Sequence, residues 1–457
     1  MSRPSSLQPR PNSRSPAHLP LYHRLLFPTC APKQVPRLID GEGKAIDEIN
    51  EKLYNLIALS LRAYILSWYT RFTKDRTLLP SIHSTILHPL LHPVLQRAYD
   101  EPESLGEWVV LDLGTVLGVH VRVWNEARGA VAVFGGNVAD AYHARLPLPS
   151  VSPSPSPSSP GAPSYTLNPT YLSALANAII PPNQPDVQQL MVREVLARAV
   201  LGGGLRRLSY GWFWYALILR FVGEPGDPLP STPSEPPTDP KPKPKTLDQT
   251  ILAHIHSLLS SLTALYTLLL SLFTLYTAAP PPPPQFHHCS DSFLVIGREL
   301  LGIDGLEGGG KKWGKRLVWG GVEMGVGFAA PLLDRIIPHL IQTRLTPELA
   351  LRLLDLTERL LFPLDGYPGP SPIDPSPAEA ADLRKRLENR LEELIPRTIR
   401  VLLLPCKDDI SRLLDPISDA GCNAHLIGMV LDGVVGVLRP DLVVANEEKA
   451  RAVETGL

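Results

Sequence analysis

The chain has 457 residues, enough for two or three domains of ordinary size, and hydrophobic residues make up 44% of it. Charged residues make up 19%, a low fraction that excludes a solvated disordered chain and favours apolar burial or contact with a membrane. The net charge of -1 argues against long-range attraction to nucleic acid, and the four distant cysteines form no metal-ligand spacing.

A basic segment rich in proline and serine opens the chain. Six Lys or Arg residues precede the first acidic residue, Asp40, which is the charge bias of a mitochondrial transit peptide. Five prolines between Pro4 and Pro20 would break the amphipathic helix that such a peptide needs. We therefore expect residues 1–39 to be a flexible basic leader.

Apolar residues then recur at helical spacing from Ile46 to Tyr99. The first part, up to Phe72, predicts one long amphipathic helix. Its expected apolar side is formed by Ile49, Leu53, Leu56, Ile57, Leu61, Tyr64, Ile65 and Trp68. Further helices are expected at Leu79–Tyr99 and Leu105–Asn125.

The segment Pro147–Pro163 alternates Pro and Ser with almost nothing to bury, which predicts a solvated insert. A helix with Pro169 near its start follows, and Asp186 is expected to cap another that ends at the glycines 202–204. The aromatic run Leu208–Val222 closes a first domain at 40–222. Residues 223–246 read as a linker rich in Pro and Lys.

The stretch Ile251–Ala279 contains no Asp, Glu, Lys or Arg and stands between two proline-rich breaks. In a helix its hydroxyl and histidine side chains recur every three or four positions, which leaves a broad leucine face. Three locations suit that pattern. The stretch could cross a bilayer, lie at the centre of a helical domain, or line a cavity that holds an apolar ligand.

Residues 247–444, which include this stretch, are predicted to form a second helical domain. Helices are expected at Ser292–Leu301, Thr346–Phe362, Pro377–Leu404 and Asn423–Leu438. A charged tail occupies residues 445–457. The fold class expected for the whole chain is all-α, with two helical domains packed together and joined by proline-rich loops.

One basic and aromatic cluster has the composition of a membrane-surface patch, with cations for anionic headgroups and indoles for the interface. Its members are Lys311, Lys312, Trp313, Lys315, Arg316 and Trp319. The alternative is an ordinary helix end whose tryptophans pack into the core. Gly305, Gly310 and Lys311 also match part of a phosphate-binding loop, but Lys312 occupies the position that needs Ser or Thr, so a glycine turn is the better interpretation.

The first domain resembles the PX-associated (PXA) domain of the sorting nexins and their fungal relatives. The residues that carry the resemblance are Trp68, Tyr69, Asp75, His120, Asn168, Pro169, Arg193 and Glu194. The segment Cys422–Leu442, which contains Asn423, and Leu360–Pro363 resemble the sorting-nexin C-terminal domain more loosely. The resemblance implies a wholly helical protein at organelle membranes, whose two domains pack around a hydrophobic tunnel for phospholipid tails.

Taken with this resemblance, the uncharged stretch is expected to form part of the tunnel wall. The expected lining residues are Leu258, Leu262, Leu265, Leu269 and Leu272. No metal or other cofactor is expected, since neither the paired histidines near 254 nor those near 287 have further ligands at zinc spacing. The chain shows no complete catalytic motif, so we expect no enzymatic reaction.

The expected function is phospholipid binding or lipid transfer in membrane trafficking, on the cytoplasmic face of endosomal, vacuolar or endoplasmic-reticulum membranes. The expected partners are phospholipid, the organelle membrane surface and trafficking proteins, and not nucleic acid. The alternative is a membrane-anchored trafficking scaffold in which Ile251–Ala279 is a transmembrane helix. An ATP-dependent enzyme that uses the glycine loop is a third, weaker hypothesis.

Overall fold

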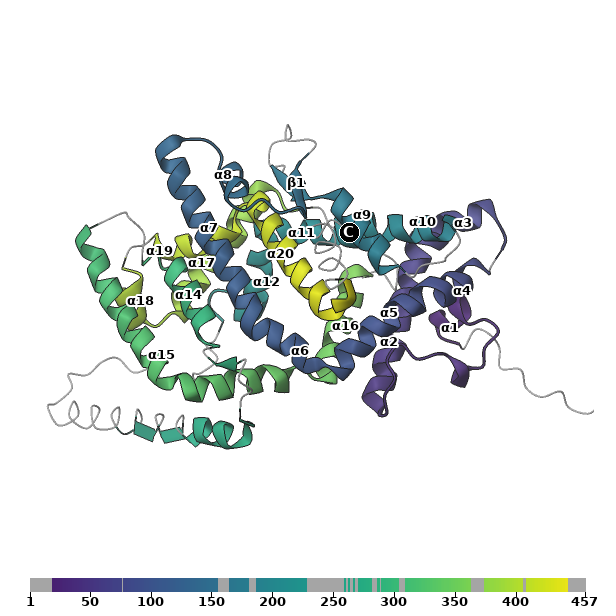
Figure 1. The fold of residues 1–457 in the computed structure, drawn as a ribbon, viewed down its shortest axis with the longest axis horizontal. Coiled ribbons are helices and arrows are strands. Elements are labelled where there is room, and N and C mark those ends of the chain that lie inside the picture. The colour runs from purple at the N-terminus through teal and green to yellow at the C-terminus, as the bar shows by residue number, and fades with distance from the viewer. Residues whose placement is uncertain are drawn as a thin grey trace, which may run out of the picture. The chain divides into compact units, whose positions relative to one another are not determined.

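A computed structural model gives the fold shown in Figure 1. It describes residues 19–75, 77–154, 164–180, 186–227, 259, 262–263, 266–267, 270–281, 286–287, 289–303, 309–362, 374–405 and 408–442. The described chain is all-α apart from one two-stranded antiparallel sheet, as the sequence predicts. It divides into two compact units, and each is discontinuous in sequence.

Unit 1 comprises Met1–Asp100, Ile179–Val192 and Leu345–Ile373. Its elements, with a 3₁₀ turn (η2) and two π-helical turns (η3 and η4), are α1 (Leu21–Leu26), η2 (Pro32–Gln34), α2 (Lys44–Leu61), η3 (Arg62–Leu66), α3 (Ser67–Phe72), α4 (Leu78–Ile82), η4 (His83–Leu87), α5 (His88–Asp100), α16 (Pro347–Leu361) and most of α10 (Asp186–Glu194). Helix α2 packs against both α1 and α16. Lys52 of α2 forms an ion pair with Asp355 of α16, and Asn55 donates to Glu358 at 3.0 Å.

The expected leader contributes to the core of unit 1. Leu26, Phe27, Leu38 and Ile39 are all buried, the first three in a cluster with Tyr54. The prediction of a flexible leader is therefore wrong for residues 21–39, because their apolar side chains pack on α2 and α4. Residues 1–18 lie outside the described part of the chain.

The long helix expected from Ile46 to Phe72 is present as α2, η3 and α3 without a break. Ile49, Leu61 and Ile65 are buried as predicted, but Tyr64 and Trp68 are exposed. The π-helical turn η3 contains both Tyr64 and Ile65 and closes hydrogen bonds five residues apart. The wider turn changes the angular spacing of side chains, so residues in it and after it, such as Trp68, no longer follow the face that a regular 3.6-residue period predicts.

Unit 2 comprises Glu101–Ala178, Arg193–Arg344 and Asp374–Leu457. Its elements, with the π turns η5 and η6 and the 3₁₀ turn η8, are α6 (Pro102–Glu107), η5 (Trp108–Asp112), α7 (Leu113–Phe134), α8 (Val138–Arg145), β1 (Val151–Pro153), β2 (Tyr165–Leu167), α9 (Pro169–Ile179), η6 (Val195–Gly204), α11 (Leu205–Ser209), α12 (Gly211–Val222), α14 (Asp291–Leu300), α15 (Gly309–Arg344), α17 (Pro377–Leu394), α18 (Arg397–Leu403), α19 (Asp409–Leu414), η8 (Asp415–Ile417) and α20 (Ala420–Leu438). Residues 270–278 are also helical.

Helix α7 is central to unit 2, since it packs against α8, α14 and α20 (Figure 1). Trp124 and Ala127 of α7, Tyr142 of α8 and Cys422 of α20 form one buried cluster. A second cluster joins α12 to α17. The C-terminal helix α20 therefore belongs to the same unit as α7 and α12, although about 200 to 300 residues separate them in the chain.

Three expected features of this unit differ from the structure. The insert at Pro147–Pro163 begins with an ordered strand, because Val151 pairs with Leu167 and is buried. The helix expected to end at the glycines 202–204 continues through the π turn η6 into α11. The helix expected over Pro377–Leu404 is broken at Ile395, because Pro396 disfavours helical backbone in the residue before it.

Candidate functional site

The described side chains of the uncharged stretch are mostly exposed. Leu262 has 63% of its surface accessible and Leu272 is half-buried, while Leu258, Leu265 and Leu269 lie outside the described residues. At its described residues the stretch is therefore not packed into the protein interior, and the assignment of its leucines to a tunnel wall stays a prediction. The end of the stretch is held in place, because the Arg335 guanidinium donates to the Ala279 carbonyl and lies 4.2 Å from the centroid of the Tyr276 ring.

The basic and aromatic cluster divides between the surface and the interior. Trp313 is 70% exposed, but Trp319 is 8% exposed and donates from its indole to Glu323 at 2.8 Å. Trp319 therefore packs into the core, as the alternative to a membrane-surface patch predicts, and it fills the space beside Gly297 of α14.

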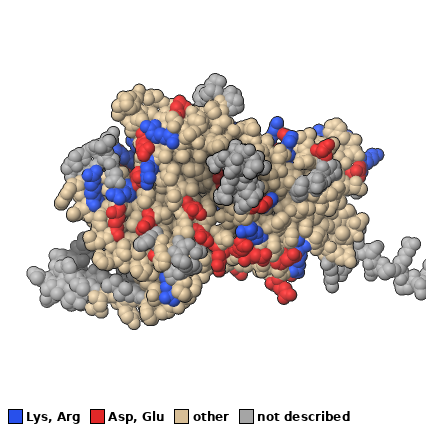
Figure 2. Space-filling view, viewed as in Figure 1, with Lys and Arg blue, Asp and Glu red and all other residues tan. Residues whose placement is uncertain are grey.

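The four basic residues of the cluster also differ in position. Lys315 is bonded to Asp409 at 3.1 Å, and Arg316 donates to the carbonyl of Ile303. Lys311 and Lys312 lie in the first turn of α15, but their side chains are outside the described part. On the face drawn in Figure 2, described acidic and basic residues are interspersed and form no continuous basic field.

His120 lies in a buried polar network of unit 2. Its Nε2 donates to the carbonyl of Pro416 at 3.1 Å, and its Nδ1 accepts from the hydroxyl of Tyr142 at 3.0 Å. Burial lowers the pKa of His120 to about 4, because the protein interior disfavours the charged form. Both ring nitrogens are occupied, so His120 is a structural residue joining α7, α8 and η8.

His425 extends this network from α20. Its Nδ1 donates to the carbonyl of Gly421, and its Nε2 accepts from Nδ1 of His143 at 2.9 Å. Burial is also the main cause that lowers the pKa of His425 to about 4. The sequence analysis missed Tyr142 and His143, because it predicts no helix at 138–145. Asn137, which caps α8 by accepting from the amide of Ala139, is a sequence signal that could have indicated this helix.

The other residues of the family resemblance also have structural contacts. Trp68 donates its indole N–H to the carbonyl of Tyr64, and Tyr69 packs against the core of unit 1. The side chains of Arg193 and Glu194 approach to 4.0 Å, and Glu194 also pairs with Arg198 at 2.6 Å. None of these contacts points to a reaction.

Asn423 is fully buried and bridges two chain segments. Its amide donates to the carbonyl of Ser209 and to that of Ile417, each at 2.8 Å. Ser209 ends α11 and Ile417 ends η8, so this one side chain fixes both turns beside the start of α20. The same two turns form the walls of a pocket.

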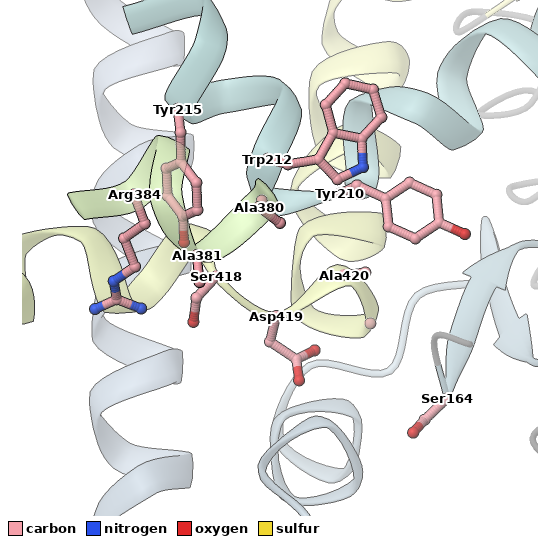
Figure 3. Close-up of a pocket in the computed structure, with 12 residues that line it drawn as sticks. Ser164, Tyr210, Trp212, Tyr215, Ala380, Ala381, Arg384, Ser418, Asp419 and Ala420 are labelled. Atoms are coloured by element: carbon pink, nitrogen blue, oxygen red, sulfur yellow. The ribbon is translucent and has the colours of Figure 1, made fainter. Parts of the chain in front are cut away.

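The pocket has a volume of about 460 Å³ and is lined by residues from four segments that lie far apart in sequence. Its lining residues are Ser164, Tyr210, Gly211, Trp212, Tyr215, Ala380, Ala381, Arg384, Ser418, Asp419, Ala420 and Gly421. The chains meet closely, since a Cβ on Gly211 would lie 2.9 Å from the carbonyl oxygen of Ile417. Figure 3 shows Tyr210 and Trp212 on one side, and Tyr215 with Arg384 on the other.

The chemistry of this pocket is aromatic and acidic. The rings of Tyr210 and Trp212 stack with their centroids 6.4 Å apart. The Arg384 guanidinium already binds Glu388 at 3.0 Å and Asp415 at 2.6 Å, so it is neutralised before any ligand arrives. The pocket is therefore poorly suited to a phosphate and better suited to an apolar or cationic group that can contact the aromatic faces.

The same pocket residues connect the first part of the chain to its C-terminal part. Tyr210–Tyr215 belong to the region expected to be the first domain, and Ala380–Gly421 to the region expected to be the second. Residues 47–221 match the family model of the PXA domain. The chain contains a PXA domain. No curated protein and no solved structure matches the chain.

The PXA domain contributes to both compact units, since its residues up to Asp100 and from Ile179 to Val192 lie in unit 1 and the others in unit 2. The domain boundaries expected from the sequence stay predictions. Among the described residues, no three His, Cys, Asp or Glu side chains are grouped so that they could hold a metal ion.

Proposed function

We propose that this PXA-domain protein binds phospholipid at organelle membranes and works in membrane trafficking without catalysing a reaction. The observation that carries the proposal is apolar helical surface that the protein does not cover. Among the described residues, three helical segments are long and apolar enough to cross a membrane, namely Pro102–Phe134, Trp313–Arg344 and Ala420–Leu438. In each segment, part of the most apolar run of 18 residues is buried inside the protein. The buried share is 39% in Pro102–Phe134, 22% in Trp313–Arg344 and 44% in Ala420–Leu438, so Trp313–Arg344 is the least covered of the three.

The PXA domain supports the trafficking part of this proposal, because it is associated with sorting-nexin and other trafficking proteins. We extend that association to the sorting-nexin-related type on the resemblance of Cys422–Leu442 to the sorting-nexin C-terminal domain. Endosomal, vacuolar or endoplasmic-reticulum membranes are the proposed location, with the protein on their cytoplasmic face.

We further propose that acyl chains are held by the leucines of residues 258–272, of which Leu262 is exposed, as a hydrophobic tunnel would hold them. Each methylene removed from water contributes about 0.8 kcal/mol, so an acyl chain of about 16 carbons dominates the binding free energy. Transfer between membranes follows if the protein can release the lipid at a second bilayer. The exposure of Leu262 supports this part of the proposal, since an apolar side chain there is available to a lipid.

The test is mass spectrometry of lipids extracted from full-length protein purified from cells. We expect co-purified phospholipid at a defined ratio, and less of it with Leu262→Asp. Leu353→Asp is the matched control, because Leu353 is a leucine that is 53% exposed and lies on α16, outside the three apolar segments. Preparations that are reproducibly free of lipid would contradict the proposal.

The second candidate is a membrane-anchored scaffold, and the length of Trp313–Arg344 favours it alongside the sequence of Ile251–Ala279. Alkaline carbonate extraction of membranes separates the candidates. A peripheral lipid-binding protein is released into the supernatant, whereas an anchored scaffold stays in the pellet. We expect release, because the charged side chains of Lys315 and Arg316 near the start of α15 have partners within the protein.

A further inference from the structure

Helix α15 presents an apolar face to solvent. Five large apolar side chains of this helix between Trp313 and Phe328 are exposed; they are Trp313, Leu317, Val322, Met324 and Phe328. Gly321 and Gly325 lie among them, and a Cβ on either would meet nothing within 4 Å. In Figure 1 α15 runs along the edge of unit 2 and changes direction, with Pro331 and Pro338 inside the helix.

The charged side chains described between Trp313 and Leu340 of α15 each have a partner within the protein. They are Lys315 with Asp409, Arg316 with the Ile303 carbonyl, Glu323 with the Trp319 indole, Asp334 with the Cys289 amide, and Arg335 with the Ala279 carbonyl. Arg316 is exposed and its partner is a neutral carbonyl, so it keeps its positive charge at the surface.

The uncharged stretch next to α15 has an apolar face of its own. Its exposed large side chains recur every three or four positions and are Leu259, Leu262, Tyr266, Leu270, Phe273 and Tyr276. Four of its hydroxyl groups donate to carbonyls of their own helix; they belong to Thr263, Ser271, Thr274 and Thr277. These hydroxyls have hydrogen-bond partners without water, as an apolar phase requires.

We propose that the outer face of α15 and the exposed side chains described between Leu259 and Tyr276 form one docking surface for the hydrocarbon region of a lipid bilayer. A protein partner needs a polar rim and complementary charges, whereas Arg316 is the one exposed charged side chain described on these faces. At 1.5 Å per residue, the apolar face of α15 from Trp313 to Phe328 is about 23 Å long, enough for many acyl-chain contacts. Trp313, Tyr266 and Tyr276 suit the boundary between headgroups and acyl chains.

The contact of Arg335 with Ala279 and Tyr276 joins the two helices of this docking surface at one end. The inference rests on the proposed function for its setting at a membrane. It adds that a surface outside the PXA domain makes the membrane contact, and that this contact needs no anionic lipid. The two faces lie at 259–276 and 313–328, beyond the matched residues 47–221.

The test is flotation of full-length protein with phosphatidylcholine vesicles. We expect Phe273→Asp and Phe328→Asp each to lower the vesicle partition coefficient by about tenfold or more, since each removes an aromatic ring from hydrocarbon. The matched controls are Phe72→Asp and Phe221→Asp, since both residues are 82% exposed at places outside these two faces. Their partition should stay within about twofold of the unsubstituted protein.

Any of three results would overturn the inference. The first is that the unsubstituted protein fails to float with the vesicles. The second is that the controls lose as much binding as the test variants, and the third is that the test variants bind as well as the unsubstituted protein. A second copy of the chain is the competing occupant, and sedimentation equilibrium detects it as a dimer that Phe328→Asp dissociates while vesicle binding is unchanged. Vesicle binding without co-purified lipid would reject the proposed function and leave the docking surface supported.

Discussion

At the scale of single residues, several buried polar side chains act by holding chain segments together. Asn423 is the clearest case, because its amide satisfies two buried carbonyls from different turns. His120 and His425 both pack against Tyr142, whose ring centroid lies 5.6 Å and 5.0 Å from theirs. Their burial in the described structure gives them measurable effects on stability.

Replacement of Asn423 by Ala should lower the free energy of unfolding by about 2–4 kcal/mol, because two buried carbonyls lose their donor. Chemical unfolding followed by circular dichroism measures the change. Ser418→Ala is the control, since the Ser418 hydroxyl is exposed and bonds only within its own turn. Its effect should stay below about 0.5 kcal/mol, and equal effects would contradict the role given to Asn423.

Unit 2 should lose stability as the pH falls from 6.5 toward 4. In the unfolded chain His120 and His425 bind a proton near pKa 6.5, whereas in the folded protein each pKa is lowered to about 4. Their stabilising contribution is thus present above pH 6.5 and lost below it. Between about pH 7 and about pH 5 we expect a loss of about 2 kcal/mol per histidine.

The measurement is urea unfolding at the two pH values for the unsubstituted protein and for His120→Gln. Glutamine does not titrate in this range, so the variant should lose about 2 kcal/mol less than the unsubstituted protein over the same change. An identical pH dependence in both proteins would show that His120 does not carry the effect.

At the scale of elements, the π turns mark the places where buried side chains stop following the 3.6-residue spacing of a regular α-helix. In η6, Gly202 lies where a Cβ would approach the Ala197 carbonyl oxygen to 2.9 Å, so only glycine fits without a shift of the backbone. Gly204, two residues further on, has open space around it. The two glycines give a matched pair for testing this turn.

Gly202→Ala should destabilise the protein by about 1–2 kcal/mol, because the added methyl group contacts a backbone oxygen. Gly204→Ala should instead be neutral or stabilise it by about 0.5–1 kcal/mol, since alanine loses less conformational entropy on folding. Thermal unfolding of the two variants measures the difference. The same sign for both variants would contradict the assignment of a tight π turn at Gly202.

These elements also show how far the sequence predicts the fold. The helices at Thr346–Phe362 and Asn423–Leu438 correspond to α16 and α20, because the apolar residues recur at helical spacing there and Pro347 stands in the first turn of α16. The outward direction of Tyr64 and the course of the chain through Gly202 depend on π turns, which no periodic pattern predicts. The pocket and the histidine network join residues about 200 to 300 positions apart, so sequence spacing could not reveal them.

At the scale of the whole molecule, the net charge of -1 and the partnered charges of α15 predict how membrane binding depends on salt. Contact driven by apolar burial is insensitive to screening, whereas attraction between a basic patch and anionic lipid weakens as the Debye length falls from about 10 Å to about 3 Å. We therefore expect vesicle partition to change by less than about twofold between about 0.1 M and about 1 M salt.

The measurement is flotation at both salt concentrations, with neutral vesicles and with vesicles that contain phosphatidylserine. Lys311→Gln combined with Lys312→Gln serves as the comparison, because it removes two cations of the predicted patch and leaves the apolar faces intact. We expect this variant to bind neutral vesicles as the unsubstituted protein does. If binding instead requires phosphatidylserine, falls about tenfold with salt and is lost in the variant, the basic patch makes the membrane contact and the apolar docking surface does not.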